Sequence, residues 1–500
     1  MPGHVELPLV LDRAASTPLA VQLGDQLRAS MRGGTLRSGE RLPSSRALAA
    51  LLGVSRTVVT EAFQQLYAEG WLEGRHGSGT YVAGLTEPGE SSGTRGAPAA
   101  GRGAAGDIPA GRDGAAAGPE LDAPGAGPRP IAMPAAGRGP DVVYTAAPGG
   151  EGFIDLRPGR PWVRDYDRAA WRRAWRRAGD RPPADVIDPY GHPRLRELLA
   201  DHLRRVRGVA VGPENVLVTR GTGHGLDLLV TTLLRPGERA GVEEPGYGKA
   251  RTIIEARGGR VVPCPVDEQG VLPAGLPGDL RLLYTTPAHQ YPLGGRLPIP
   301  RRERLLAWAR RSGAMVVEDD YDAEFRYDVA PLPALYGLDP ERVVLLGTLS
   351  KSLAPDIGIG WLVATPALLA RIAQVRHALT DRTSGPVQEA VSVLLERGDL
   401  DRHLRRARLS YARRRAAVVD ILGGLVTGDS AGLHVFLPLP AERVGPLVAA
   451  AAERGVLLDT ADRHHHGPVR HPGLVIGYGS VSQAELRKGC AIVAGLLAGG

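Results

Sequence analysis

The 500 residues suggest two to four domains, and 43% hydrophobic content is enough for a large buried core. The net charge of +7 permits a polyanionic partner without requiring one, and two distant cysteines outside any CxxC pair exclude a disulfide or zinc framework, as is typical of a reducing cytoplasm. The N-terminus lacks the regions of a signal peptide and no uncharged apolar run reaches the roughly 18 residues of a membrane span, so we expect a cytoplasmic protein that does not engage a membrane.

Residues 1–82 are predicted to form a winged helix-turn-helix. Apolar residues at helical spacing predict helices over 21–34, 42–53 and 55–70, and a Gly-containing turn joins the second helix to the third. Residues 71–82 read as a strand, a Gly-rich turn and a second strand, which is typical of a hairpin wing.

The third helix of this unit is the predicted DNA-reading element. Its apolar stripe leaves the first turn facing outward, where backbone N–H groups can bind a phosphate and an arginine can reach a guanine edge in the major groove. The alternative is a protein-contact module, because eight arginines against seven acids give the unit a charge of only about +1. The candidate DNA contacts are Arg46, Ser55, Arg56 and Thr57 on the helices and His76 and Gly77 at the wing tip.

Residues 83–149 are predicted to be a flexible linker. Between Ser91 and Pro140, 34 of 50 residues are Gly, Ala or Pro, and no apolar periodicity runs through the stretch. Such a segment cannot bury a core, and about 60 residues of it span roughly 40 Å, so the two ends can work as separate bodies.

Residues 150–500 repeat an apolar strand, a polar or Gly-rich edge and a helix. A strand, a Gly-rich turn and a helix are expected over 215–234. Further strands are expected around 239–247, 281–290, 314–325 and 342–351, with a helix at 301–313 among those between them. This alternation predicts a mostly parallel α/β sheet, which binds ligands beyond the carboxyl ends of its strands.

The predicted strand ends carry the outline of a pyridoxal phosphate site. The chain has only three lysines, and Lys351 follows an apolar strand, where its amine can form a Schiff base. Asp319 can pair with a ring N–H⁺, Tyr321 with a phenolate oxygen, and Tyr247 can stack on the ring. Backbone N–H groups at Thr222 and Gly223 can hold a phosphate. Each group alone has an ordinary structural explanation, so only their joint placement carries weight.

Two stretches resemble known families. "LPSSRALAALLGVSRTVVTEAFQQLYAEGWLEGRHGSGTYV" is similar to the winged helix of GntR-family transcription regulators, in which the six positions named above contact operator DNA. "TTPAHQYPLGG", "VVEDDYDAEFRY" and "GTLSKSLAP" resemble the fold-type I aminotransferase-like domain of MocR-type regulators, with a smaller C-terminal subdomain. The resemblance implies Lys351 as the Schiff-base lysine, with Asp319 at the pyridine nitrogen, Tyr321 near the phenolate and Tyr247 on the ring.

The sequence departs from that family at three places. Gly358 stands where an arginine usually holds the cofactor phosphate, which leaves Thr222, Gly223, Ser350 and backbone groups for that task. Val475 stands where an arginine usually clamps a substrate carboxylate, and Lys249 replaces a frequent arginine near Tyr247. Candidate replacements for the carboxylate clamp are Arg463 and Arg470. The run His464–His466 is expected in a solvent-exposed loop and not at a metal.

These features predict a regulator that binds double-stranded operator DNA and senses pyridoxal phosphate or an amine effector through Lys351. The family resemblance implies a homodimer. Two alternatives remain: an active aminotransferase with a DNA-binding appendage, and a regulator whose large domain has lost the cofactor, which Gly358 motivates.

Overall fold

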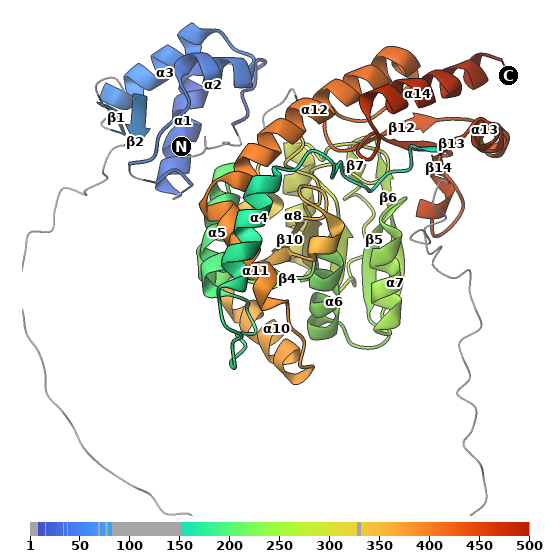
Figure 1. Ribbon diagram of the computed structural model, residues 1–500. Coiled ribbons are helices and arrows are strands. Elements are labelled where there is room, and N and C mark those ends of the chain that lie inside the picture. The colour runs from blue at the N-terminus through green and yellow to red at the C-terminus, as the bar shows by residue number, and fades with distance from the viewer. Residues whose placement is uncertain are drawn as a thin grey trace, which may run out of the picture. The chain divides into compact units, whose positions relative to one another are not determined.

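The computed structural model describes residues 9–15, 17–33, 35–37, 39–68, 71–75, 79–82, 152–327 and 332–499. Figure 1 shows the helices and strands of both folded units. The predicted linker, 83–149, lies outside the described residues, as do the wing-tip positions His76 and Gly77.

The N-terminal unit has the predicted three helices and hairpin. The first helix begins two residues before its predicted start, and all three end one or two residues early. The two strands pair antiparallel, with Leu72 opposite Val82 and Arg75 opposite Gly79. The elements are α1 (Leu19–Arg32), α2 (Ser45–Leu52), α3 (Arg56–Ala68), β1 (Leu72–Arg75) and β2 (Gly79–Val82).

Local chemistry explains the turn between α2 and α3. The Ser44 hydroxyl accepts a hydrogen bond from the backbone of Ala47 and caps α2. Gly53 ends α2 with φ 63°, a left-handed conformation that glycine adopts without steric cost. The predicted apolar stripe of α3 is confirmed, since Val59, Phe63 and Leu66 are buried against α1 and the hairpin.

A mixed, mostly parallel sheet of eight strands forms the centre of the large domain, in the order β4-β11-β10-β9-β8-β5-β6-β7. Strands β10, β9, β8, β5 and β6 run parallel, and β11 is antiparallel to both of its neighbours. The strands are β4 (Val216–Thr219), β5 (Arg239–Glu244), β6 (Arg260–Asp267), β7 (Gly270–Val271), β8 (Leu282–Thr285), β9 (Met315–Asp319), β10 (Val343–Thr348) and β11 (Gly360–Val363).

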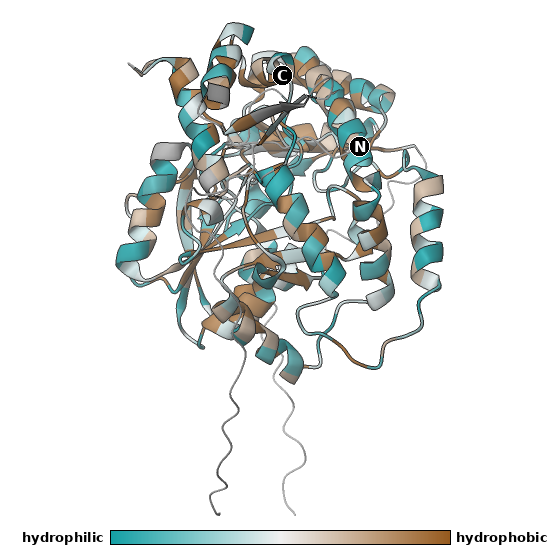
Figure 2. Ribbon diagram, turned by 90° about the vertical axis from the view of Figure 1, so that its left-hand side faces the viewer, coloured by the Kyte–Doolittle hydropathy of each residue, from teal (hydrophilic) through white to brown (hydrophobic). Residues whose placement is uncertain are grey.

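Helices cover both faces of this sheet, because its strands are apolar on both sides. Val317, Val344 and Leu346 pack with α6, α7 and α10, whereas Val316 and Leu345 belong to the larger core. In Figure 2 the helices carry both hydrophilic and hydrophobic bands, as expected of helices with one buried face. The helices are α4 (Arg168–Gly179), α5 (Pro193–Arg207), α6 (Thr222–Leu233), α7 (Gly248–Ala256), α8 (Ile299–Ser312), α9 (Leu335–Leu338), α10 (Pro366–Ala378) and α11 (Gly385–Glu396), with short 3-10 turns η1 (Pro213–Asn215) and η2 (Pro355–Ile357).

The smaller C-terminal subdomain is built on an antiparallel sheet in the order β12-β15-β14. A two-residue strand near the start of the large domain, β3, pairs with β13 of this subdomain. Its elements are α12 (Asp399–Leu422), η3 (Gly423–Leu425), β12 (His434–Pro438), α13 (Ala441–Glu453), β13 (Val456–Leu457), β14 (Asp459–Thr460), η4 (Asp462–His464), β15 (Gly473–Gly477) and α14 (Gln483–Ala498), with β3 at Ile154–Asp155.

The topology brings the predicted functional strand ends to one edge. The carboxyl ends of β4, β5, β8, β9 and β10 share a direction, so the segments that follow them meet at the same side of the sheet. Within the described ranges, no helix has the apolar length that crossing a bilayer requires.

Candidate functional site

The candidate DNA face lies at the start of α3. Ser55, Arg56 and Thr57 are exposed, as predicted from the apolar stripe, and Arg46 on α2 is exposed as well. The Ser55 hydroxyl accepts a hydrogen bond from the backbone of Val58 at 3.4 Å and caps the helix. The Arg56 Nε donates to the Ser45 hydroxyl at 3.3 Å, an exposed contact that a DNA base or phosphate can replace.

Lys351 lies in the turn after β10, at the shared edge of the large sheet. Its ammonium donates to the carbonyl of Gly159. The pKa of Lys351 is lowered to about 8, mainly because the amine is buried. The positive charge of Lys249 also lowers this pKa, whereas the negative charges of Asp322 and Asp319 raise it. A lysine with this pKa has a substantial fraction of free amine near neutral pH, which nucleophilic attack on a carbonyl requires.

Asp319 ends β9 and is 3% exposed. The Tyr284 hydroxyl donates to its Oδ2, whereas Oδ1 is buried without a hydrogen-bond partner. Burial raises the pKa of Asp319 to about 7, although the hydrogen bond from Tyr284 and the nearby Thr222 hydroxyl oppose this shift. A buried carboxylate oxygen without a partner is suited to a ligand that brings its own N–H⁺.

Tyr321 lies two residues beyond Asp319 and contacts a group of polar residues that the sequence analysis missed. Its hydroxyl donates to the His289 carbonyl at 3.1 Å and lies 3.1 Å from His289 Nδ1. The same Nδ1 lies 2.8 Å from a carboxylate oxygen of Asp322. The ring of His434, from β12, is centred 4.7 Å from the His289 ring. The motifs "PAHQ" and "YDAEF" contain two of these residues, but no local signal links them to His434.

Tyrosine rings line the same region. Tyr247 precedes α7, and its ring lies nearly parallel to that of Tyr284 at 6.3 Å. Tyr291, which the sequence analysis also missed, has edge contacts with the rings of Tyr247, Tyr321 and His434. Tyr247 is therefore placed beside Tyr284, whose hydroxyl holds Asp319.

The N-terminus of α6 lies at this edge and has no side-chain cap. Gly221 precedes the helix with φ 115°, and a Cβ there would lie 3.4 Å from the Thr348 hydroxyl and 3.9 Å from that of Ser350. Thr222 and Gly223 are the first helical residues, so their N–H groups have no partner within the helix. The Ser350 hydroxyl and this helix start can together receive a phosphate.

Gly358 ends the turn η2, just before β11. Its φ is 55°, and a Cβ at this position would meet nothing within 4 Å. A first side-chain carbon would therefore meet no neighbour, but the backbone has taken a left-handed conformation that disfavours most other residues.

The residues at this edge fit pyridoxal phosphate. Asp319 Oδ1 suits the pyridine nitrogen, Tyr321 the phenolic oxygen, Lys351 the aldehyde carbon, and the start of α6 with Ser350 the phosphate. When bound, this cofactor supplies an aldehyde that reacts with amines and a ring that withdraws electrons. The protein contributes position, a buried carboxylate and an amine of lowered pKa.

The small sheet presents a second group of residues. Val475 lies in β15, opposite Asp459 of β14 and Phe436 of β12. Asp459 is 4% exposed, and Arg463 Nε lies 3.1 Å from its Oδ1. The His464 Nε2 lies 3.5 Å from Asp459 Oδ2, and burial lowers the pKa of His464.

The prediction of an exposed histidine loop is wrong for two of its three residues. His464 and His465 are 5% and 8% exposed, and only His466 is open to solvent. The reason is tertiary packing: the His464 carbonyl accepts hydrogen bonds from Gly246 N and Arg251, which fix this segment on the loop after β5. Of the other two candidates from the sequence, Arg470 is exposed in the following loop, and burial lowers the pKa of Lys249 on the first turn of α7.

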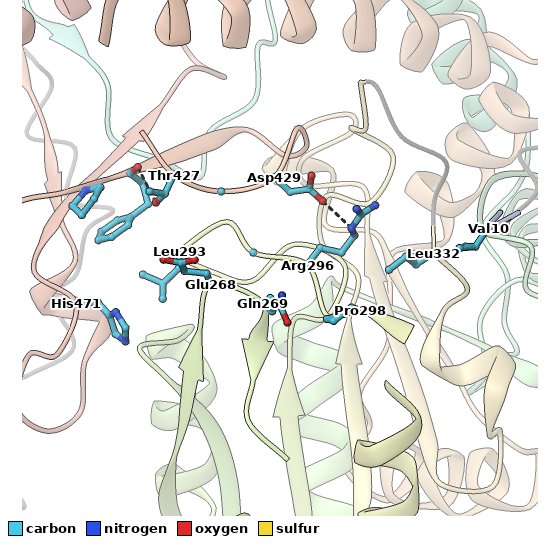
Figure 3. Close-up of a pocket in the computed structure, with 14 residues that line it drawn as sticks. Val10, Glu268, Gln269, Leu293, Arg296, Pro298, Leu332, Thr427, Asp429 and His471 are labelled. Carbon is cyan, nitrogen blue, oxygen red and sulfur yellow. Dashed lines mark hydrogen bonds and ion pairs between the residues drawn. The ribbon is translucent and has the colours of Figure 1, made fainter. Parts of the chain in front are cut away.

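A hollow beside the small sheet is shown in Figure 3. Arg296 and Asp429 form an ion pair of 2.9 Å in its wall, and His471 and Phe436 also line it. Phe436 therefore points toward the large domain. The face of the small sheet that carries Phe436 is the one turned toward that domain. None of the residues predicted for the cofactor lines this hollow.

The comparisons with known proteins agree with this geometry. Residues 19–82 match the family "Bacterial regulatory proteins, gntR family", and residues 164–474 match "Aminotransferase class I and II". The chain is 35% identical over 96% of both chains to the HTH-type pyridoxine biosynthesis transcriptional regulator PdxR of Corynebacterium glutamicum. It is 34% identical to the probable rhizopine catabolism regulatory protein MocR of Rhizobium meliloti, over 96% of this chain and 94% of the other.

Among solved structures, the large domain resembles LysN, the α-aminoadipate aminotransferase of Thermus thermophilus, with a TM-score of 0.62 and 26% identity over 70% of this chain and 93% of that one. The predicted fold class, an N-terminal helix-turn-helix followed by a fold-type I aminotransferase-like domain, is confirmed, and the cofactor of that fold is pyridoxal phosphate. The chain belongs to the MocR-type group of gntR-family transcription regulators, in which a winged helix-turn-helix precedes an aminotransferase class I and II domain.

Proposed function

We propose that this regulator binds operator DNA through α3 and holds pyridoxal phosphate on Lys351, where it senses the cofactor itself or an amine that reacts with it. The observation that carries the proposal is the pairing of Lys351, with a pKa of about 8, and Asp319, with an unpartnered buried oxygen, at one edge of one sheet. A chain that had lost the cofactor would have no reason to keep an unpartnered carboxylate oxygen in its interior.

The output of the sensor is a change in how two winged helices sit on paired DNA half-sites. A homodimer supplies the two copies, as in dimeric helix-turn-helix proteins generally. A ligand shifts the regulator between two arrangements only by its difference in affinity for them. Residues around Lys351 that contact the ligand in one arrangement and not in the other would provide this difference in affinity.

The test is the absorption spectrum of the purified full-length protein titrated with pyridoxal phosphate. Condensation of the Lys351 amine with the cofactor aldehyde forms a C=N bond and releases water, and the conjugated product absorbs visible light. We expect a saturable band in the wild type and none in Lys351→Ala. Lys488→Ala is the matched control, because Lys488 is an exposed lysine on α14.

Two outcomes would contradict the proposal. The absence of a band in the wild type would mean that the large domain serves only as a scaffold. A band of equal amplitude in Lys351→Ala would place the reaction at another amine. Because the pKa of Lys351 is about 8, the rate of band formation is expected to rise with pH and to level off above that value.

The DNA face is tested by Arg56→Ala, assayed on duplexes selected in vitro from a random pool by the wild-type protein. The loss of one arginine contact to a base is expected to weaken binding by about 5- to 150-fold, which corresponds to about 1–3 kcal/mol. Arg371→Ala removes the same charge from the large domain and is expected to leave binding unchanged. Equal losses in both variants would argue against a specific role for α3.

A further inference from the structure

Helix α4 of the large domain carries positive charges along its outer face. The helix contains five arginines and no acidic residue. Three of the arginines are exposed and spaced four residues apart, and we call them the α4 row: Arg168, Arg172 and Arg176. The alanines two residues further along are buried: Ala170, Ala174 and Ala178. Two residues correspond to about 200° around a helix, so the row points away from the core.

The α4 row is not explained by contacts within the domain. Its three guanidinium groups have no hydrogen bond or ion pair with any residue that the structure describes. On the neighbouring α5, by contrast, Arg194 pairs with Glu197 and Arg196 pairs with Asp188. Like charges four residues apart repel each other, and an arginine in the first turn opposes the helix dipole. The row therefore does not serve the stability of α4.

The start of α12 lies beside α4 (Figure 1). Arg173 of α4 forms an ion pair of 3.4 Å with Asp399, the first residue of α12. The ring of Tyr166, just before α4, is centred 4.7 Å from that of His403 in α12. These two contacts make the outer faces of the two helices parts of one surface.

Helix α12 adds further arginines to this surface. It contains seven arginines and three acidic residues, and Arg405, Arg406 and Arg413 are exposed, with no hydrogen bond or ion pair among the described residues. Arg406 and Arg413 are seven residues apart and so share a face of the helix. The pKa of Asp167, which caps α4, is lowered by a backbone hydrogen bond and also by the charge of Arg406. Arg406 is therefore close to the start of the α4 row.

These two helices hold the excess positive charge of the chain. Together they carry +9, whereas the whole chain carries +7 and the winged unit only about +1. Double-stranded DNA carries one negative charge for about every 1.7 Å of its axis, and pairing with these phosphates supplies sequence-independent affinity. The chain thus places its main electrostatic attraction to DNA outside the unit that reads the bases.

We propose that the α4 row, with Arg406 and Arg413 of α12, is a second DNA-contacting surface that binds the phosphate backbone outside the half-sites read by α3. This inference rests on the DNA binding of the proposed function. The row spans roughly 12 Å at 1.5 Å for each residue, and one DNA strand has a phosphate about every 3.4 Å of its axis, so about three phosphates lie within its length. Such contacts position the protein and carry no sequence information.

The experiment measures DNA affinity by fluorescence anisotropy over a series of salt concentrations, with full-length protein. One long duplex carries, at its centre, the site selected in vitro by the wild type, and a second carries the same bases scrambled. The row variant replaces Arg168, Arg172 and Arg176 together with glutamine. We expect it to bind both duplexes about tenfold more weakly and to lower the slope of log K against log salt by about 2–3. The preference for the selected site should stay unchanged, in contrast to Arg56→Ala.

Two further triple variants serve as controls. Glutamine at Arg260, Arg311 and Arg454 removes the same charge from exposed positions elsewhere in the large domain, and the affinity should stay within about twofold of the wild type. Lysine at the three positions of the α4 row keeps the charge and should restore binding to within about threefold of the wild type, because a phosphate accepts a point charge as partner. Equal losses in both glutamine variants would overturn the inference, since net charge alone would then explain them.

The remaining outcomes separate this inference from the proposed function. A row variant that binds both duplexes like the wild type would overturn the second surface, while a loss in Arg56→Ala would leave the proposed function standing. Unchanged binding by Arg56→Ala would count against the proposed reading of DNA by α3 instead. Light scattering reports the oligomeric state, and dissociation of the wild-type oligomer in the row variant would assign the row to a subunit interface. Binding to phosphatidylserine vesicles that depends on the row, with unchanged DNA affinity, would assign it to a membrane. Either result would overturn the inference.

Discussion

Replacement of Asp319 with asparagine is expected to stabilise the cofactor-free protein at pH 8.5 and to weaken pyridoxal phosphate binding by about 10- to 100-fold. The weaker binding follows from loss of a charged partner for the pyridine N–H⁺, since hydrogen bonds to charged groups contribute about 1.5–3 kcal/mol. The gain in stability follows from removal of a carboxylate that the fold buries without full compensation.

The pH dependence has a definite sign. The pKa of Asp319 is raised from 3.8 to about 7, so the folded protein binds this proton more tightly than the unfolded chain does. The favourable contribution is fully present below about pH 3.8 and is lost progressively as the pH rises from there through about 7. At pH 8.5 the buried charge costs on the order of 4 kcal/mol, from about 1.4 kcal/mol for each unit of pKa.

In Asp319→Asn this cost is absent, but the asparagine NH₂ lacks a partner, which costs about 1–3 kcal/mol at every pH. The variant should therefore unfold at a higher temperature than the wild type at pH 8.5. At pH 5.5, where the wild type has lost only about 2 kcal/mol, the difference should shrink to little or nothing. Differential scanning fluorimetry of the cofactor-free proteins measures both values. Asp279→Asn is the control, because Asp279 is 62% exposed and paired with Arg239. An equal shift at both pH values would contradict the assigned cause.

Added pyridoxal phosphate is expected to reverse this order in the same experiment. The cofactor's N–H⁺ gives the wild-type carboxylate the partner that the apo protein lacks, so saturation should stabilise the wild type far more than Asp319→Asn. The site is thus built at some expense to the stability of the empty protein, as is common for functional sites.

The sequence predicted those parts of the site that lie within single strand-and-turn units. Lys351, Asp319 and the start of α6 each follow an apolar strand, and parallel strands bring such ends together whatever the details of packing. The helices of the winged unit were equally predictable, because Ser44, Gly53 and Ser55 mark their ends by local chemistry.

The missed residues depend on the docking of the small subdomain. His434 comes from β12 and meets His289 across more than 140 residues, and no periodicity encodes that contact. The burial of His464 depends in the same way on Arg251 and Gly246 of the large domain. A run of three polar residues normally indicates an exposed loop, and only tertiary packing reverses that expectation.

The two unusual positions, Gly358 and Val475, have different surroundings. A Cβ on Gly358 would meet nothing within 4 Å, and without an arginine there the start of α6 and Ser350 are the groups predicted to receive the phosphate. Val475 is fully buried, and Asp459 lies directly opposite it and holds Arg463. Both positions therefore lack the arginine that the family resemblance leads one to expect, and Arg463 lies beside Asp459, opposite the second of them.

Replacement of Arg207 with methionine is expected to destabilise the large domain by about 3–5 kcal/mol, the usual cost of leaving a buried charge without its partner. Arg207 ends α5 and is 3% exposed. Its Nε and NH2 donate to the two carboxylate oxygens of Asp320 at 2.5 and 3.2 Å. Asp320 immediately follows Asp319, so this ion pair fixes the backbone at the end of β9.

The measurement is thermal unfolding of the full-length protein, in which the loss should lower the unfolding temperature of the large domain by on the order of 10 °C. Arg194→Met is the matched control on the same helix. Arg194 pairs with Glu197 and Glu396, but all three side chains are about half exposed, so the change should stay within about 0.5 kcal/mol.

The double variant Arg207→Met/Asp320→Asn separates the two components of the loss. If the main cost in Arg207→Met is an uncompensated Asp320 carboxylate, neutralising it should recover part of the stability even though a second polar contact has been removed. If the cost is the loss of packing by the arginine stem, the double variant should be no more stable than Arg207→Met. Because Asp320 adjoins Asp319, we also expect Arg207→Met to weaken pyridoxal phosphate binding and the double variant to restore part of it.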